Sequence, residues 1–299
     1  MSTQGHEKAV LLLAFGGPES MDEVEPFLRE LMEGRQITPG QIESVKQRYR
    51  LIGGGSPLKS ITAQQAKSLE AAFNESGPAY RVFVGMRYTP PFIEQAVDGI
   101  LSLGIRDLVA LPLSPYYNSA STGKYLQKLE QAVSGKQLHT RIIRSYNTNP
   151  IFMNALEQSV REIIKDIDNP YVIFSAHSLP AATARADGYV DQLEQTLGLM
   201  VQHLSLSRFA LGFQSRGIAG GDWLGPDVKE ILERCANNGE KNIVVVPYGF
   251  VSDHVETLYD IDIVYKASAV SLGLNFFRAP SLNASPLFIQ ALKDVVAGT

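Results

Sequence analysis

Cysteine is nearly absent from this chain: Cys235 is the only one among 299 residues. A single thiol cannot form an internal disulfide, and it cannot hold an iron–sulfur cluster by itself. Long hydrophobic runs are also missing, because the longest, such as residues 9–15, are far too short to span a bilayer. The N-terminal segment Met1–Lys8 is polar and lacks the apolar core of a signal peptide. We therefore expect a cytoplasmic protein.

An excess of positive charge is missing as well. The net charge of -4 argues against a surface dedicated to nucleic acid, although a local basic patch remains compatible with it. Hydrophobic residues make up 44% and charged residues 19%, a balance typical of a folded globular protein. The length allows one large domain or two of ordinary size. No surface heptad or repeat indicates a partner subunit, so we expect a monomer.

Short apolar runs alternate with longer amphipathic stretches along the chain. Continuous apolar runs are typical of strands buried on both faces, and strand–helix alternation is typical of an α/β fold with parallel sheets. The eight predicted strands are Ala9–Phe15, Arg81–Val84, Leu108–Leu113, Thr140–Ile143, Tyr171–Phe174, Phe209–Phe213, Asn242–Val246 and Leu274–Phe277. The predicted helices include Ile93–Leu103, Met153–Ile167, Val228–Ala236 and Pro286–Val296.

A faint internal similarity divides these strands into two sheets of four. Residues 109–117 (VALPLSPYY) resemble residues 244–252 (VVVPYGFVS), since each is a strand that ends in proline and leads into an aromatic loop. The similarity is explained equally well by convergence of two unrelated strands on the residues that commonly end a strand. The similarity predicts an N-terminal unit of residues 1–147 and a C-terminal unit of residues 148–283. The last helix, in residues 284–299, is expected to pack back on the first unit.

The residues that follow each strand are the first candidates for chemistry, because ligands of such folds gather at the carboxyl ends of the strands. His177 follows the fifth predicted strand, three residues before Pro180. Its imidazole can bind a metal or accept a proton near neutral pH. The competing interpretation is a histidine that is only hydrogen-bonded within its loop.

An acidic pattern follows the seventh predicted strand. We expect a helix to begin at Ser252 or Asp253, either of which can cap it. On that helix Asp253, Glu256 and Asp260 recur at spacings of three and four and share one face. Carboxylates in a row could pass a divalent cation, whereas a solvated acidic face is the commoner explanation. His254 would point elsewhere on the same turn.

His177 and Glu256 together would form a mixed nitrogen and oxygen site. Such a set suits ferrous iron, and it equally suits zinc or cobalt. The sequence contains no tight His/Cys spacing of the structural-zinc type. So few ligands predict a metal that passes through the site as a substrate rather than a permanent cofactor.

Two glycine-rich loops lack the signatures of phosphate binding. Residues 15–18 (FGGP) and 52–57 (IGGGSP) carry neither a Walker lysine nor the glycine spacing of a dinucleotide site. Their glycines could instead let a flat ligand approach the backbone. Aromatic rings and arginines near the strand ends could stack on such a ligand and pair with its carboxylates. The polar and aromatic side chains in question are Arg48, Tyr49, Ser56, Arg87, Tyr88, Tyr116, Tyr117 and Tyr125.

Five segments, in order over nearly the whole chain, resemble the ferrochelatases. The stretches SAHSLP and SDHVETLY are the most specific of them. The resemblance implies a class II chelatase-like fold: two similar Rossmann-like halves, each a four-stranded parallel sheet flanked by helices, with a porphyrin between them. The five segments are Ala14–Pro18, Arg48–Pro57, Ser175–Pro180, Trp223–Asp227 and Pro247–Asp260.

The resemblance also implies roles for individual residues. His177 and Glu256 match the catalytic, metal-binding pair on one side of the tetrapyrrole centre, and Asp260 would be an outer relay. Phe15 matches the residue that approaches the opposite face. With Phe15, the expected porphyrin-binding residues are Arg48, Tyr49, Ser56, Arg87, Tyr88, Tyr117, Tyr125 and Trp223.

Departures from the family refine these expectations. The chain ends without the cysteine-rich segment of some relatives, so we expect no iron–sulfur cluster. Residues 34–50 are shorter and more polar than the apolar lip of membrane-associated relatives, so no stable membrane association is expected.

Phe15 and Met32 bear on the substrate. Relatives that use coproporphyrin often carry a tyrosine and an arginine at these positions. Phenylalanine cannot ligate iron, and methionine cannot pair with a propionate. We therefore expect a lyase of haem biosynthesis that inserts Fe²⁺ into protoporphyrin IX rather than coproporphyrin III, with release of two protons. The alternatives are a non-catalytic porphyrin or haem carrier and a chelatase for another metal.

Overall fold

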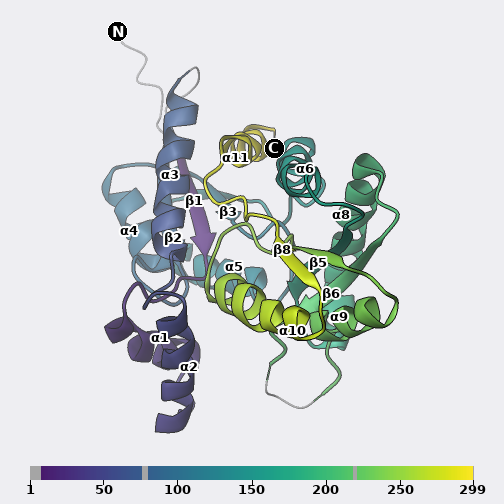
Figure 1. Cartoon of the computed structure of the whole chain (residues 1–299). Coiled ribbons are helices and arrows are strands. Elements are labelled where there is room, and N and C mark those ends of the chain that lie inside the picture. The colour runs from purple at the N-terminus through teal and green to yellow at the C-terminus, as the bar shows by residue number, and fades with distance from the viewer. Residues whose placement is uncertain (1–7, 76–79, 218–220, 299) are drawn as a thin grey trace.

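Figure 1 shows the computed structural model, which describes residues 8–75, 80–217 and 221–298. Residues 1–7, whose polar sequence led us to expect no signal peptide, lie outside the described residues. The strands form two parallel four-stranded sheets with the orders β2-β1-β3-β4 and β6-β5-β7-β8. The two orders are identical in pattern, so the predicted fold of two similar α/β halves is confirmed. No helix in the described part of the chain is long and apolar enough to cross a membrane.

The first sheet and its helices come from the N-terminal half of the chain. The strands are β1 (Lys8–Ala14), β2 (Tyr80–Met86), β3 (Asp107–Pro112) and β4 (His139–Ile142). The helices are η1 (Met21–Glu23), α1 (Val24–Leu31), α2 (Pro39–Leu51), α3 (Leu58–Asn74), α4 (Ile93–Ser102) and α5 (Thr122–Val133).

The second sheet repeats this plan in the C-terminal half. All eight predicted strands and all four named helices form, with ends that shift by a few residues. The strands are β5 (Tyr171–His177), β6 (Phe209–Gln214), β7 (Asn242–Val246) and β8 (Asn275–Arg278). The helices are α6 (Pro150–Ile164), α7 (Ala181–Ala186), α8 (Tyr189–Leu204), α9 (Val228–Asn237), η2 (Glu256–Tyr265), α10 (Lys266–Ser271) and α11 (Pro286–Ala297).

Burial on both faces explains why the central strands read as continuous apolar runs. In β1 every residue after Lys8 is buried. The strand pairs in parallel with β2 on one side and β3 on the other, so that Leu11 is opposite both Phe83 and Ala110. Helices cover both faces of such a sheet, and no polar side is needed.

Each sheet has one point where its strand order reverses, and these two points position the candidate residues. The chain runs outward from β1 to β2 and then crosses to β3, and it repeats this path from β5 to β6 and β7. Ligands of open parallel sheets bind outside the carboxyl ends of the strands at such a point. Phe15 follows β1, His177 ends β5, and the loop after β7 leads to Glu256.

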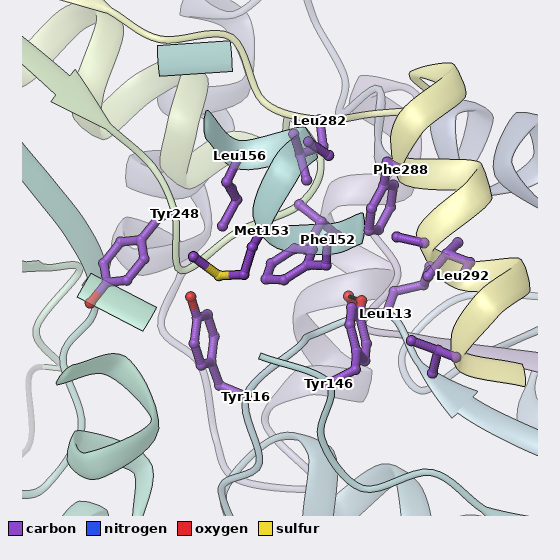
Figure 2. Packing of buried hydrophobic residues seen from close by; sticks show 14 of the residues in the cluster. Leu113, Tyr116, Tyr146, Phe152, Met153, Leu156, Tyr248, Leu282, Phe288 and Leu292 are labelled. Atoms are coloured by element: carbon purple, nitrogen blue, oxygen red, sulfur yellow. Dashed lines mark hydrogen bonds between the residues drawn. The ribbon is translucent and has the colours of Figure 1, made fainter. Parts of the chain in front are cut away.

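One large apolar cluster contains residues of both halves. Figure 2 shows Tyr116, from the loop after β3, and Tyr248, from the loop after β7, at one side of the cluster; their ring centroids are 5.8 Å apart. At the other side of this cluster the ring centroids of Phe152, in α6, and Phe288, in α11, are 6.4 Å apart. Helix α11 packs against both α3 of the first half and α6 of the second. The last helix therefore stabilises both halves at once.

We predict that Phe288→Ala lowers the free energy of unfolding by about 3–5 kcal/mol, because the side chain is fully buried and its removal leaves a cavity. Denaturant titration followed by circular dichroism measures this loss. Val270→Ala, at an exposed position of α10, is the control and should change stability by about 0.5 kcal/mol or less. A similar small effect for both variants would show that α11 does not support the core.

Candidate active site

His177 is the last residue of β5 and lies at the carboxyl edge of the second sheet. Its Nδ1 is 2.5 Å from the carbonyl oxygen of Ser178. A carbonyl oxygen only accepts hydrogen bonds, so Nδ1 carries a proton and donates it. The other ring nitrogen, Nε2, is thereby left to face the site with either a lone pair or a second proton.

Glu256 lies between two imidazoles. Its Oε1 is 3.3 Å from Nε2 of His177, and its Oε2 is 3.6 Å from Nε2 of His254. The side chains of His177 and Glu256 are 34% and 28% exposed, so small solutes can reach them. Gln214, at the end of β6, donates a 2.9 Å hydrogen bond to the carbonyl oxygen of Glu256 and fixes the backbone there. An imidazole and a carboxylate so arranged can bind a borderline metal or exchange protons.

The helix that carries Glu256 begins later than the sequence predicted. Residues 252–254 are not helical, and η2 follows the i→i+5 hydrogen bonding of a π-helix from Glu256 onward. Short π-helical segments are frequent at functional sites. The expectation that His254 points elsewhere is wrong, because the residue precedes the helix and its ring faces Glu256.

Asp253 was expected on the same helix face as Glu256, and that expectation is wrong as well. The Asp253 carboxylate accepts hydrogen bonds from Nη1 of Arg278 at 3.0 Å, from Ser281 at 2.8 Å and from Asn283 at 3.0 Å. Arg278 ends β8, Ser281 and Asn283 follow it, and together they occupy both carboxylate oxygens. Asp253 therefore holds the loop before η2 in place and does not share a helix face with Glu256.

The charges of His177 and Glu256 support each other. Burial lowers the pKa of His177, but the Glu256 carboxylate and the Ser178 carbonyl outweigh burial and raise the pKa from 6.5 to about 9. Burial raises the pKa of Glu256, yet His177 and then His254 hold it well below its ordinary value. At neutral pH the pair is therefore an imidazolium beside a carboxylate.

Asp260 continues the polar face of η2 beyond Glu256. It accepts a 2.6 Å hydrogen bond from Oγ of Ser215. Burial raises the pKa of Asp260, the Ser215 hydrogen bond opposes this change, and the Glu256 charge raises the pKa further. Arg48 reaches this helix from α2, with its guanidinium 5.5 Å from the ring centroid of Tyr259.

Phe15 presents an aromatic surface at the carboxyl edge of the first sheet. It is 36% exposed, and its ring packs edge-on against Tyr88 at 4.7 Å and Phe27 at 6.3 Å between centroids. The two glycine-rich loops meet beside it, because the Ser56 amide donates a 2.7 Å hydrogen bond to the carbonyl of Pro18. The exposed ring of Phe15 and the glycine-rich loops beside it can together accept the face of a flat ligand.

Several expected porphyrin contacts are buried. Tyr49 packs with Tyr88 in a cluster that also contacts Val255 of the second half. Tyr125 belongs to the core between the first sheet and α5. Burial raises the pKa of Tyr49 and of Tyr125, and the charge of Glu256 raises both further. The two phenols thus lie within electrostatic range of Glu256 but do not form open surface. Ser56 is also buried.

Tyr117 and Trp223 belong to opposite halves of the molecule. Gln192 of α8 bonds to both the amide and the carbonyl of Tyr117, at 2.8 and 3.1 Å, and so connects the halves. The Arg144 guanidinium lies 5.6 Å from the Tyr117 ring centroid. Trp223 forms a β-bridge with Pro180 and therefore lies beside the segment that follows β5.

Sequence reasoning missed three residues of this region. His254 was within the recognised motif, but the assumed helix start directed it away from Glu256. Gln192 and Asp187 left no signal, because a polar residue near an amphipathic helix is ordinary. In the structure Asp187 accepts 2.7 Å hydrogen bonds from both the amide and the hydroxyl of Ser119, which adds a second connection between the halves.

The site offers a metal few protein ligands. His177 supplies one nitrogen and Glu256 one carboxylate, so most coordination positions of a bound ion would stay open to other donors. No larger cluster of His, Cys, Asp or Glu arranged to hold a metal occurs in residues 8–75, 80–217 and 221–298.

Known proteins resemble the chain over nearly its full length. A model of the ferrochelatase family matches residues 7–299. The ferrochelatase of Herpetosiphon aurantiacus is 38% identical over 97% of this chain and 98% of its own. That of Deinococcus radiodurans is 36% identical over 99% of this chain and 98% of its own.

Two solved structures share the fold at low identity. SirB from Bacillus subtilis with Fe³⁺ aligns with a TM-score of 0.63 and 12% identity over 97% of this chain and 94% of that one. CbiX, the terminal enzyme for biosynthesis of sirohaem in denitrifying bacteria, aligns with a TM-score of 0.57 and 11% identity over 98% and 99%. Both are class II chelatases in fold. By its family match and its close relatives, this chain belongs to the ferrochelatase family and is an enzyme that inserts metal into a porphyrin in haem biosynthesis.

Proposed function

We propose that the chain inserts Fe²⁺ into protoporphyrin IX in preference to coproporphyrin III and releases two protons. The observation that carries the iron-binding role is the accessible pair of His177 Nε2 and Glu256 Oε1, 3.3 Å apart. In this proposal the protein acts as a cytoplasmic monomer with no permanent cofactor and no stable membrane association. Iron and porphyrin are both substrates.

His177 is the first iron ligand in this proposal, and a proton acceptor after iron has left it. Its pKa of about 9 means that Nε2 is protonated at neutral pH, and iron must displace that proton. Because Nδ1 remains bonded to the Ser178 carbonyl, only Nε2 exchanges proton for metal. Glu256 is ionised before iron arrives; it helps to strip water from the ion and can carry protons away from the site.

Asp260 is suited to carry protons away from the pair. Its pKa is raised while that of Glu256 is lowered, so a proton that leaves the pair is better accepted by Asp260. The Ser215 hydroxyl, which donates to Asp260, can hold that carboxylate in position. We therefore assign Asp260 as the outer relay.

The porphyrin would lie between the half that carries Phe15 and the half that carries Trp223. A ring bound in a buckled shape exposes its nitrogen lone pairs, so binding that shape stabilises the transition state. Phe15 has no oxygen for iron, and Met32, at the end of α1, has no charge for a further propionate. Both residues favour protoporphyrin IX, which has two propionates where coproporphyrin III has four.

The proposal predicts faster anaerobic turnover of Fe²⁺ with protoporphyrin IX than with coproporphyrin III at equal concentrations. Loss of free-base porphyrin absorbance measures both rates. Faster turnover of coproporphyrin III would refute the stated preference. Tight binding of both porphyrins with insertion into neither would refute the proposed reaction and support a porphyrin carrier.

We predict that His177→Ala abolishes measurable insertion while porphyrin binding, followed by fluorescence quenching, stays within about twofold of wild type, because uniform binding is separable from transition-state interactions. His139→Ala, at the exposed start of β4, is the matched control and should retain full turnover. Near-normal turnover by His177→Ala would remove this residue from the reaction.

We predict that Glu256→Gln lowers turnover about 10²-fold or more, the usual contribution of a positioned proton carrier. The same change should lower the pKa of His177 from about 9, because the attracting charge of Glu256 is lost while burial remains. A titration of the imidazole by ¹⁵N NMR measures this pKa. An unchanged pKa would show that the two side chains are not paired in solution.

A further inference from the structure

Arg87 is a buried cation beside the aromatic surface of the first half. It follows β2, and only 7% of its side chain is exposed. Its guanidinium lies 4.4 Å from the ring centroid of Tyr88, which in turn contacts Phe15. Burying an arginine in this way requires a compensating anion.

Glu33, whose side chain is largely exposed to solvent, supplies that anion. Its Oε1 is 2.6 Å from Nη2 of Arg87, although 60% of the Glu33 side chain is exposed. Glu33 follows α1 in a left-handed backbone conformation, with φ of 49°, which is uncommon for a residue other than glycine. A short turn thus bends an exposed carboxylate towards a buried guanidinium.

The contact leaves part of the guanidinium unused. The buried Nε of Arg87 has no hydrogen-bond acceptor among the residues that the structure describes. Nε and Nη2 share one edge of an arginine, and a carboxylate can take both in a bidentate pair. Glu33 takes only Nη2, so a ligand carboxylate could bind this edge more completely.

We propose that Glu33 is an internal substitute for a porphyrin carboxylate, which pairs with Arg87 before the substrate binds and is displaced by a propionate. This inference rests on the proposed function. It makes Glu33 a specificity-determining residue, because a propionate can bind Arg87 only when the ion pair between Glu33 and Arg87 is broken. A porphyrin without free carboxylates cannot displace Glu33 from Arg87 and does not meet this competition.

Neighbouring lysines can attract the Glu33 carboxylate after it has been displaced from Arg87. The Arg87 hydrogen bond lowers the pKa of Glu33, and Lys124 and Lys128 add to this effect, so Glu33 remains ionised. Lys128 also bonds to the carbonyl of Arg87 at 3.1 Å and lies 3.6 Å from Glu30. Glu30 is thus a nearby carboxylate of the same region that does not contact the guanidinium.

The test compares wild type, Glu33→Gln and Glu30→Gln, each titrated with deuteroporphyrin IX and with its dimethyl ester by fluorescence quenching. We expect Glu33→Gln to bind the diacid about fivefold more tightly, because the competing ionic pair is lost. The diester should bind all three proteins equally. Glu30→Gln should match wild type with both ligands, since it removes a charge of the same sign nearby but no competitor.

Three results would overturn the inference while leaving the proposed function standing. Unchanged or weaker diacid binding by Glu33→Gln would make Glu33 a support for Arg87. An equal gain for diacid and diester would indicate relief of a steric block. An equal gain in Glu30→Gln would indicate a general effect of charge. Failure of wild type to bind either porphyrin would instead overturn the proposed function, and the inference with it.

Discussion

The attraction between one imidazole and one carboxylate, held 3.3 Å apart at the edge of a parallel sheet, is the interaction on which the site depends. Burial by itself disfavours both charges, since it lowers the pKa of His177 and raises that of Glu256. Together they remain ionised, and the Ser178 carbonyl leaves only one nitrogen to react. In the proposed reaction, a divalent ion would meet a preformed anion and a proton that it can replace.

The two sheets bring these groups together through their identical strand orders. Each sheet places its reversal point beside its first strand, so residues after β1, β5 and β7 lie at carboxyl edges. The relative position of the halves is then fixed by a shared core and by polar contacts such as Gln192 to Tyr117. Helix α11 packs on both halves and adds to the contact between them.

Much of this could be predicted from local patterns. Apolar runs predicted the strands, and in central strands such as β1 and β5 the runs are continuous because a strand buried on both faces has no polar side to alternate. His177 was found for the same reason, since it ends such a run. Asp253 and His254 were misassigned, because helical spacing was counted from a start that the chain does not use. The capping preference of Asp253 was overridden by hydrogen bonds that Arg278 and Asn283 donate to its carboxylate, which local sequence does not reveal.

The sequence by itself determined the α/β class, the repeated plan of two sheets and the family, and it indicated His177 and Glu256 as the candidate pair. These properties follow from periodicity and from motifs that are contiguous in the chain. Only the tertiary structure decided that His254 faces Glu256, that Asp253 is an anchor, and that Glu33 pairs with Arg87 from 54 residues away. The physical reason is that charge pairing and burial depend on distances in space, and a single sequence records only the order of residues.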